Sequence, residues 1–309
     1  MKINLATIYY DHASQYDRDE DDKMLIHQVI EAIQQAFDMA FNNDPSCVGI
    51  ELDWTGFEHQ QHAHDVAMYL PLFSQEEVTR KAFYQWPAAW HKHVPSSAFP
   101  YCEVQTDTRY PVHPQRPPMP KGTVYSRYDT TIEKTVSFRV IDQEKDLERF
   151  TRWMNDPRVA EFWEQAWSEE KLKECLQSRL DDAHIIPLIG EFDGQPFGYV
   201  EAYWVAEDRL SPYYQVDSFD RGIHLLVGET AFRGPHFFNA WMKGLTHYLF
   251  CDENRTQRIV LEPRADNQRL FTRLQDVGYS KCFEFNFPHK RSALWMLHRQ
   301  SFFKEQGSC

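Results

Sequence analysis

The segment with the clearest chemistry runs from Asp220 to Phe237 and reads DRGIHLLVGETAFRGPHF. An apolar strand that carries His224 is followed by a short loop and by an Arg-Gly turn, Arg233 and Gly234, that would open a helix. Such a turn presents unpaired backbone N–H groups at the positive end of a helix dipole, which suits a pyrophosphate. A histidine upstream on that strand lies where a base could face the group that the pyrophosphate carries. An acyl-CoA transferase needs this arrangement.

The chain after residue 134 alternates between expected strands and helices. Apolar runs bounded by turn residues predict strands, and apolar residues at helical spacing predict helices. The expected strands are 135–141, 185–192, 197–204, 222–228, 258–262, 279–285 and 292–298; the expected helices are 145–155, one capped by Ser168, 235–250 and 268–276. The order β-α-α-β-β-β-α-β-α-β-β is that of a GNAT acyltransferase fold, of the α/β (α+β) class.

The residues before 109 predict a separate α/β domain. Apolar residues recur at helical spacing from Lys23 to Phe41 and predict one long helix. Residues 47–52 are expected to form a buried strand and residues 75–83 a second helix. No catalytic pattern is present in this part of the sequence.

A Pro-rich segment at residues 110–120 suggests the boundary between two domains. Prolines remove hydrogen-bond donors and hold an extended backbone, as in a stiff connector. The expected division is 1–108 for the N-terminal domain, 109–134 for the linker and 135–309 for the GNAT domain.

Charge and composition exclude several classes of partner. The 309 residues carry a formal net charge of −13, which argues against a nucleic acid or an anionic membrane as partner. The six cysteines form no CxxC pair and suggest reduced thiols. The chain shows no signal peptide and no apolar run of about 20 residues. We therefore expect a soluble cytoplasmic protein.

Several histidines invite a metal interpretation: His59, His62 and His64, with His91 and His93 further along. Their spacing fits no standard zinc motif, and no cysteine joins them. No metal is expected.

Seven further strings sharpen the assignment of the fold. They are RPPMP at 116–120, VYSRYD at 124–129, RFTRWMNDPRV at 149–159, FWEQ at 162–165, YW and AEDR within 203–209, LEPRADNQRLF at 261–271 and FPHKR at 287–291. With the Asp220–Phe237 segment, they resemble the GNAT N-acyltransferases of hydroxamate-siderophore biosynthesis, most nearly the N(6)-hydroxylysine acetyltransferases of aerobactin synthesis. The resemblance covers roughly the last two-thirds of the chain; in this family the first part looks like a degenerate GNAT copy.

The resemblance implies transfer of acetyl from acetyl-CoA to the hydroxylated side-chain nitrogen of N(6)-hydroxylysine, which makes an iron-chelating hydroxamate. One alternative is acetyl or succinyl transfer to N-hydroxyputrescine or N-hydroxycadaverine. Another is a non-catalytic CoA-binding scaffold of the pathway. Contact with other enzymes of the pathway would suit either role.

The resemblance also assigns the catalytic pair, His224 and Asp266. His224 would take a proton as the tetrahedral intermediate collapses, because imidazole titrates near neutral pH. Asp266 would bind the hydroxylamine or orient His224. The alternative for His224 is a core histidine bonded to a carbonyl, and for Asp266 a plain helix cap.

Acyl-CoA is expected to contact backbone amides and one cation. The residues expected there are Leu226, Val227, Gly228, Arg233, Gly234, His236, Phe237 and Asn267. The family pattern is Gln/Arg-x-x-Gly-x-Gly/Ala, and this chain has only the first glycine, Gly234. His236 stands at the second position, where its side chain narrows the approach of the pyrophosphate to the backbone. A strand amide near residues 225–227 would serve as the oxyanion contact.

The acceptor is expected to lie against aromatic and charged side chains. Trp163, Tyr203 and Trp204 would form a slot for its aliphatic stem, and Asp208 would meet an ammonium group. Arg264 or Lys290 would meet an α-carboxylate. Taken singly, each could equally be a core aromatic or a surface charge.

Overall fold

The computed structural model describes residues 2–13, 22–57, 66–68, 72 and 77–305. The chain divides into two compact units, residues 1–89 with 303–309, and residues 90–302. This boundary lies earlier than the expected one at residue 109. The reason is that the chain from Trp90 onward pairs with the larger unit, where His91 forms a β-bridge with Tyr125.

The smaller unit contains short strands and one long helix. Its elements are β1 (Lys2–Asn4), α1 (Leu5–Ala13), α2 (Asp22–Asn43), β2 (Gly49–Asp53), β3 (Glu77–Thr79) and α4 (Arg80–Tyr84). The long helix and the strand near residue 50 are confirmed. The helix expected at 75–83 is wrong at residues 77–79, because Glu77–Thr79 pair with β2 instead, and residues 75 and 76 lie outside the described chain. The degenerate GNAT copy stays a prediction.

The larger unit is built on one mixed sheet with the strand order β12-β13-β11-β10-β9-β8-β7-β6. Its strands are β4 (Glu103–Val104), β5 (His113–Pro114), β6 (Thr123–Asp129), β7 (Lys134–Val140), β8 (Ile185–Phe192), β9 (Gln195–Trp204), β10 (Arg221–Val227), β11 (Arg258–Leu261), β12 (Ser280–Asn286) and β13 (Arg291–His298). Its helices are α5 (Gln143–Met154), α6 (Pro157–Trp163), α7 (Glu169–Asp181), α8 (Pro235–Asp252) and α9 (Gln268–Asp276), and α10 (Arg299–Glu305) ends the described chain. The expected elements of this unit are confirmed within two residues at each end.

The expected linker at 109–134 is wrong, because it contains two strands. β5 pairs with β4, and β6 pairs with β7 as an edge strand of the large sheet. The prolines end at Pro120, and Gly122, at φ 63°, turns the chain into β6. The GNAT sheet therefore begins before residue 135.

α6 is a short helix that the sequence reading missed. Asp156 caps it by accepting a hydrogen bond from the backbone N–H of Arg158, and Pro157 occupies its first turn. The Asp156-Pro157 pair thus starts a helix whose last residue is Trp163.

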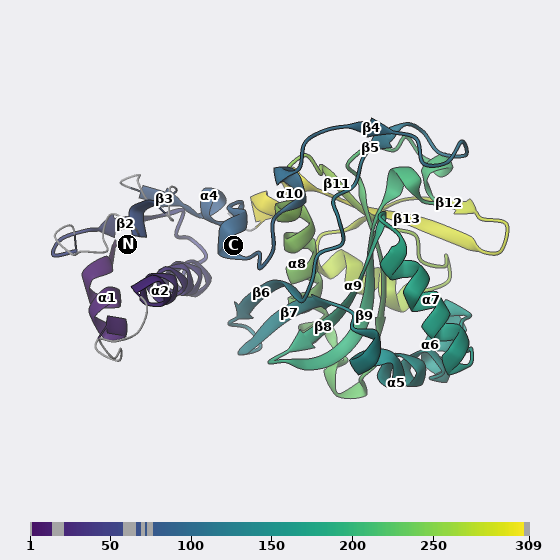
Figure 1. Cartoon of the computed structure of the whole chain (residues 1–309), viewed down its shortest axis with the longest axis horizontal. Coiled ribbons are helices and arrows are strands. Elements are labelled where there is room, and N and C mark those ends of the chain that lie inside the picture. Colours follow the sequence, from purple (N-terminus) through teal and green to yellow (C-terminus); the bar gives the residue numbers. More distant parts are fainter. Residues whose placement is uncertain (1, 14–21, 58–65, 69–71, 73–76, 306–309) are drawn as a thin grey trace. The chain divides into compact units, whose positions relative to one another are not determined.

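Helices cover both faces of the sheet, with α5, α6 and α7 on one face and α8 and α9 on the other (Figure 1). On the first face, Tyr199 of β9 packs against Phe150 of α5, with ring centroids 4.8 Å apart. On the second, Arg221 of β10 pairs with Asp252 at the end of α8. Side chains alternate along a strand, so His224, three residues after Arg221, lies on the α5 face. None of the described helices is both long and apolar enough to span a bilayer.

The pairing of β10 changes along its length. It is antiparallel to β9 from Arg221 to Val227, but it pairs with β11 only at Arg221 and Gly222. Beyond Gly222 the β11 side of β10 is open. Both hollows described below lie along this open edge.

Asp146 fixes α5 to the sheet. Its buried carboxylate accepts hydrogen bonds from Nη1 and Nη2 of Arg139 at 2.6 and 2.9 Å, and from Nη1 of Arg149 at 2.6 Å. We expect Asp146→Ala to lower the free energy of unfolding by about 3 kcal/mol, because it removes one partner of a buried ion pair.

Asp142→Ala is the matched control, since it removes the helix cap that accepts from the Glu144 N–H at 3.1 Å. It should cost about 1 kcal/mol. Urea denaturation followed by tryptophan fluorescence measures both variants. Equal losses would contradict the role given to Asp146.

Candidate active site

His224 lies between two carboxylates. The strand register places it opposite Glu201 of β9, and Glu262 directly follows β11. Nδ1 of His224 is 2.9 Å from Oε2 of Glu201, and Nε2 is 3.0 Å from Oε1 of Glu262. Ionised carboxylates only accept hydrogen bonds, so the ring donates from both nitrogens and is an imidazolium.

The pKa values of the three groups follow from this pairing. Burial alone would lower the pKa of His224, but the two carboxylates outweigh it and raise that pKa to about 10. Burial likewise opposes ionisation of Glu201, yet His224 brings the pKa of this carboxyl down to about 2, and it lowers the pKa of Glu262 as well. The expectation that His224 takes up a proton near neutral pH is therefore contradicted, because the ring is already charged.

The remaining oxygens of both glutamates are also bonded. Oε1 of Glu201 accepts from the Tyr199 hydroxyl at 3.1 Å and from Nε of Arg179 at 3.0 Å. Oε2 of Glu262 accepts from the Tyr203 hydroxyl at 3.0 Å. Each of the four carboxylate oxygens thus has a donor, which fixes the orientation of the cluster.

Tyr203, expected to line the acceptor slot, instead supports the cluster from within the core. Its ring lies against His224 with centroids 4.6 Å apart. It occupies the space over Gly222, where a Cβ would fall 2.0 Å from Cζ of Tyr203. Glycine at this strand position is what admits the tyrosine ring.

A cavity of about 540 Å³ opens beside His224 and both glutamates. Trp163 lines it and donates from Nε1 to the Leu225 carbonyl at 3.2 Å. Asp208, Arg209 and Lys290 also line the cavity. Burial raises the pKa of Asp208 and lowers that of Lys290. Aromatic surface with charges of both signs suits an amino acid with a long aliphatic stem.

A second hollow, of about 230 Å³, adjoins the first, since Trp163 and Leu225 line both. Its wall carries four arginines: Arg158, Arg233, Arg269 and Arg273. Of the expected cofactor-binding residues, Leu226, Val227, Arg233, Gly234 and Asn267 line it. Partial burial and the charges of Arg269 and Arg158 lower the pKa of Arg233. A bound polyanion would relieve this crowding of cations.

Backbone donors face the same hollow. The Gly228 N–H bonds to the Phe197 carbonyl at 2.9 Å, so by the alternation of the ladder the N–H groups of Leu225 and Val227 point away from β9. α8 begins after Gly234, at φ 132°, and within the described chain no side chain caps its first turn. These are the donors that an anionic ligand requires.

Asp266 lies apart from His224. Its side chain is 64% exposed, and it accepts two hydrogen bonds from Arg264, at 3.1 and 2.6 Å. Arg264 lines the cavity but is held by this pair. Asn267 caps α9 by accepting from the Leu270 N–H at 3.2 Å. The expectation that Asp266 orients His224 is therefore wrong, because Glu201 and Glu262 bond to both nitrogens of that ring. A role of Asp266 in binding the hydroxylamine stays a prediction.

Four other expected contacts also lie elsewhere. Gly228 donates its N–H to the Phe197 carbonyl within the sheet. His236 and Phe237 do not line the arginine-lined hollow at the start of α8. Trp204 lies on the opposite face of the sheet, where the Arg221 guanidinium sits 3.9 Å from its ring centroid. The histidines at 59, 62 and 64 are outside the described residues.

Glu201 and Glu262 were missed by the sequence reading, although a signal existed. Glu201 is the only charged residue in FGYVEAYW at 197–204, and Glu262 ends the apolar run IVLE at 259–262. A carboxylate in a buried apolar strand needs a cationic partner. His224, on the strand between them, is that partner.

Comparison with known proteins gives the same fold. Residues 142–287 match the family described as the acetyltransferase (GNAT) domain. The aminoglycoside acetyltransferase AAC(6')-Ib, solved in complex with coenzyme A, aligns with a TM-score of 0.50 and 22% identity over 55% of this chain and 98% of its own.

Two relatives are similar in sequence. The N(6)-hydroxylysine O-acetyltransferase of Escherichia coli is 46% identical over 88% of this chain and 85% of its own length. The N(5)-hydroxyornithine:cis-anhydromevalonyl coenzyme A-N(5)-transacylase of Beauveria bassiana is 39% identical over 62% of this chain and 43% of its own length.

The charge of His224 predicts how the cluster responds to pH. Its folded pKa is raised to about 10 from 6.5, so its contribution to stability is complete below pH 6.5 and is lost as the pH rises through 10. For Glu201 the pKa is lowered to about 2 from 4.5, so its contribution is complete above pH 4.5 and is lost toward pH 2. We expect the stability difference between the native protein and His224→Gln to be largest from pH 4.5 to 6.5.

Nitrogen-15 NMR of the histidine ring measures the state of His224 directly. Both ring nitrogens should show imidazolium shifts through pH 8. A neutral ring at pH 7.5 would contradict the charge assignment.

Proposed function

Because the chain belongs to the GNAT acyltransferase family, we propose that it transfers acetyl from acetyl-CoA to the hydroxylated side-chain nitrogen of N(6)-hydroxylysine. The product is a hydroxamate of the kind that siderophores use to chelate iron(III). The observation that carries the proposal is the meeting of two hollows at Leu225, one rich in arginine and backbone donors and one beside the charged cluster of His224.

The arginine-lined hollow suits the coenzyme. The open N–H groups of β10 and the uncapped start of α8 would bind the pyrophosphate and the thioester oxygen. Arg233 and Arg269 would meet phosphate oxygens. This assignment keeps Leu226, Val227, Gly234 and the expected cation, and omits His236 and Phe237.

The cavity beside His224 suits the acceptor. Trp163 would pack against the aliphatic stem, Asp208 would bind the α-ammonium group, and Arg209 with Lys290 would bind the α-carboxylate. Among the described residues, Arg209 and Lys290 share only one carboxylate oxygen, Oε1 of Glu262, at 3.6 and 3.9 Å. A hydroxylated diamine would bring no second carboxylate to these two cations, which favours the amino acid.

The chemistry follows from the charges of the cluster. The tetrahedral adduct carries a positively charged nitrogen whose proton is strongly acidic, so even a carboxylate of low pKa can accept it. Glu262 is the acceptor that we propose, and His224 stays protonated and holds that carboxylate in place. The thiolate leaves with a proton supplied through solvent.

The nucleophilic atom is a separate question, because the Escherichia coli relative is named an O-acetyltransferase. We propose attack by nitrogen, as the name of the Beauveria relative states for its own reaction. An N-acetyl product is a hydroxamate and forms a coloured complex with iron(III), whereas an O-acetylhydroxylamine does not.

We also propose a cytoplasmic location, where acetyl-CoA is formed, and contact with the other enzymes that make and use the hydroxylated amine. The free cysteines among the described residues fit a reducing compartment.

The catalytic assignment predicts that His224→Gln and Glu262→Gln each lower kcat by at least about 100-fold, the usual contribution of proton transfer by a positioned group. Asp266→Asn should stay within a few-fold of the native rate. Release of CoA from acetyl-CoA with hydroxylysine gives the rate, and the iron(III) colour identifies the N-acetyl product.

Binding of acetyl-CoA provides the control for folding, because the two substituted side chains do not line its hollow. A large loss in Asp266→Asn with full activity in Glu262→Gln would overturn this assignment. CoA release without a hydroxamate would favour O-acetylation.

The acceptor assignment predicts that Arg209→Gln raises KM for hydroxylysine by about 10-fold or more, the value of a charge-assisted hydrogen bond. KM for N-hydroxycadaverine should change little, since that amine lacks the carboxylate. Steady-state kinetics with both amines measure these two KM values. Equal effects on the two would contradict the assignment of Arg209.

A further inference from the structure

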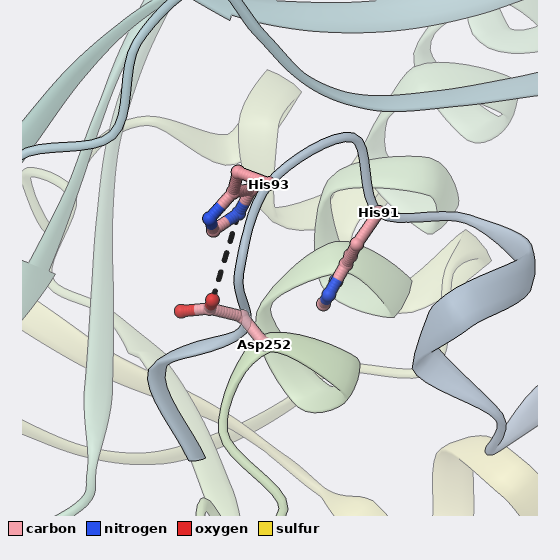
Figure 2. A group of neighbouring side chains, drawn as sticks. All are labelled: His91, His93 and Asp252. Atoms are coloured by element: carbon pink, nitrogen blue, oxygen red, sulfur yellow. Dashed lines mark ion pairs between the residues drawn. The ribbon is translucent and has the colours of Figure 1, made fainter. Parts of the chain in front are cut away.

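A second group of ionisable side chains lies on the face of the sheet opposite His224. His91 and His93 precede β6, and Asp252 is the last residue of α8. One ligand atom from each lies within 4.8 Å of the other two, and Figure 2 shows His93 facing the Asp252 carboxylate, with the His91 ring beside them. We propose that His91, His93 and Asp252 bind a divalent transition-metal ion, zinc being the best fit to two imidazoles and one carboxylate.

His91 offers a free lone pair. Its Nε2 lies 3.3 Å from the Tyr248 carbonyl and must donate there, which places the lone pair on Nδ1. His91 is 9% exposed, and its Nδ1 is buried without a hydrogen-bond partner among the described residues. A buried polar atom of this kind requires an explanation, and a bound cation supplies one.

His93 completes the pair of nitrogen ligands. Its Nε2 lies 3.7 Å from Oδ1 of Asp252 and 3.3 Å from the Tyr248 hydroxyl. Burial lowers the pKa of both rings, which favours the unprotonated form that a metal ion requires.

The carboxylate is already oriented by other groups. Oδ2 of Asp252 accepts from the Ser96 hydroxyl at 2.8 Å and from Nη1 of Arg221 at 3.1 Å, and Oδ1 accepts from the Ser96 N–H at 3.0 Å. Such bonds hold a metal ligand in place in known sites. The charge of Arg221 opposes a cation, so we expect weaker binding than in a zinc finger.

The geometry needs a modest closure. Zinc–ligand bonds of about 2.0–2.2 Å place ligand atoms about 3.3 Å apart in a tetrahedron. Ligand atoms up to 4.8 Å apart must therefore close by as much as about 1.5 Å, through rotation of the imidazole side chains. A cavity of about 180 Å³, lined by His93 and Ser96, adjoins the group and gives room for water as the fourth ligand. A bound ion would tie the chain before β6 to the end of α8.

The test uses the full chain after dialysis against a chelator. Calorimetry with Zn²⁺ and visible absorption with Co²⁺ give stoichiometry and affinity. We expect one ion per chain, a loss of at least about 10-fold in affinity for His91→Gln and for His93→Gln, and no change for the exposed control His298→Gln. Zinc should raise the melting temperature of the native protein and of the control only.

If either variant does not fold, X-ray absorption of the native zinc complex still tests the proposal. Two imidazole ligands per zinc are expected, and any other number overturns the site. The proposal also fails if the native protein binds no Zn²⁺ or Co²⁺ at a saturable site, or if both variants bind as tightly as the native protein.

Discussion

Three charges are buried together where β9, β10 and β11 meet, and the site depends on the protonated His224 ring that joins the two glutamates. Glu201 and Glu262 can remain ionised in the core because His224 is protonated between them. The cost of burying these groups is offset by hydrogen bonds to every carboxylate oxygen. Removing His224 leaves the two buried carboxylates with partly exposed cations, Arg179 for Glu201 and Arg209 for Glu262. The cluster therefore links β9, β10 and the end of β11, and it also lines the acceptor cavity.

The divergence of β10 from β11 gives this cluster access to a ligand. Two residue pairs join the strands, and past Gly222 the edge of β10 carries N–H groups that the sheet does not use. Had the two strands stayed paired to their ends, these donors would have been consumed by the ladder. The same sheet separates His224 from the group at Asp252, so the proposed metal has no direct part in acyl transfer.

Much of the fold could be predicted because its signals are local. Ser168 at the start of one helix and the Arg233-Gly234 turn at the start of another each mark an element end within a few residues of sequence. The cluster could not be predicted in the same way, because Glu201, His224 and Glu262 meet through strand register. The family pattern pointed to Asp266, whose side chain the structure pairs with Arg264, two residues away. The prolines within 109–134 likewise predicted a linker, but part of this segment forms β6 because it pairs with β7.

The shared wall of the two hollows has a kinetic consequence. Among the residues that line either hollow in the described chain there is no cysteine, serine or threonine, so neither hollow offers the thiol or hydroxyl that commonly carries an acyl group between donor and acceptor. In the proposed reaction both substrates would then occupy the protein together, in a ternary complex. The reaction would follow a sequential rather than a ping-pong course, and acetyl-CoA alone would leave no acylated enzyme behind.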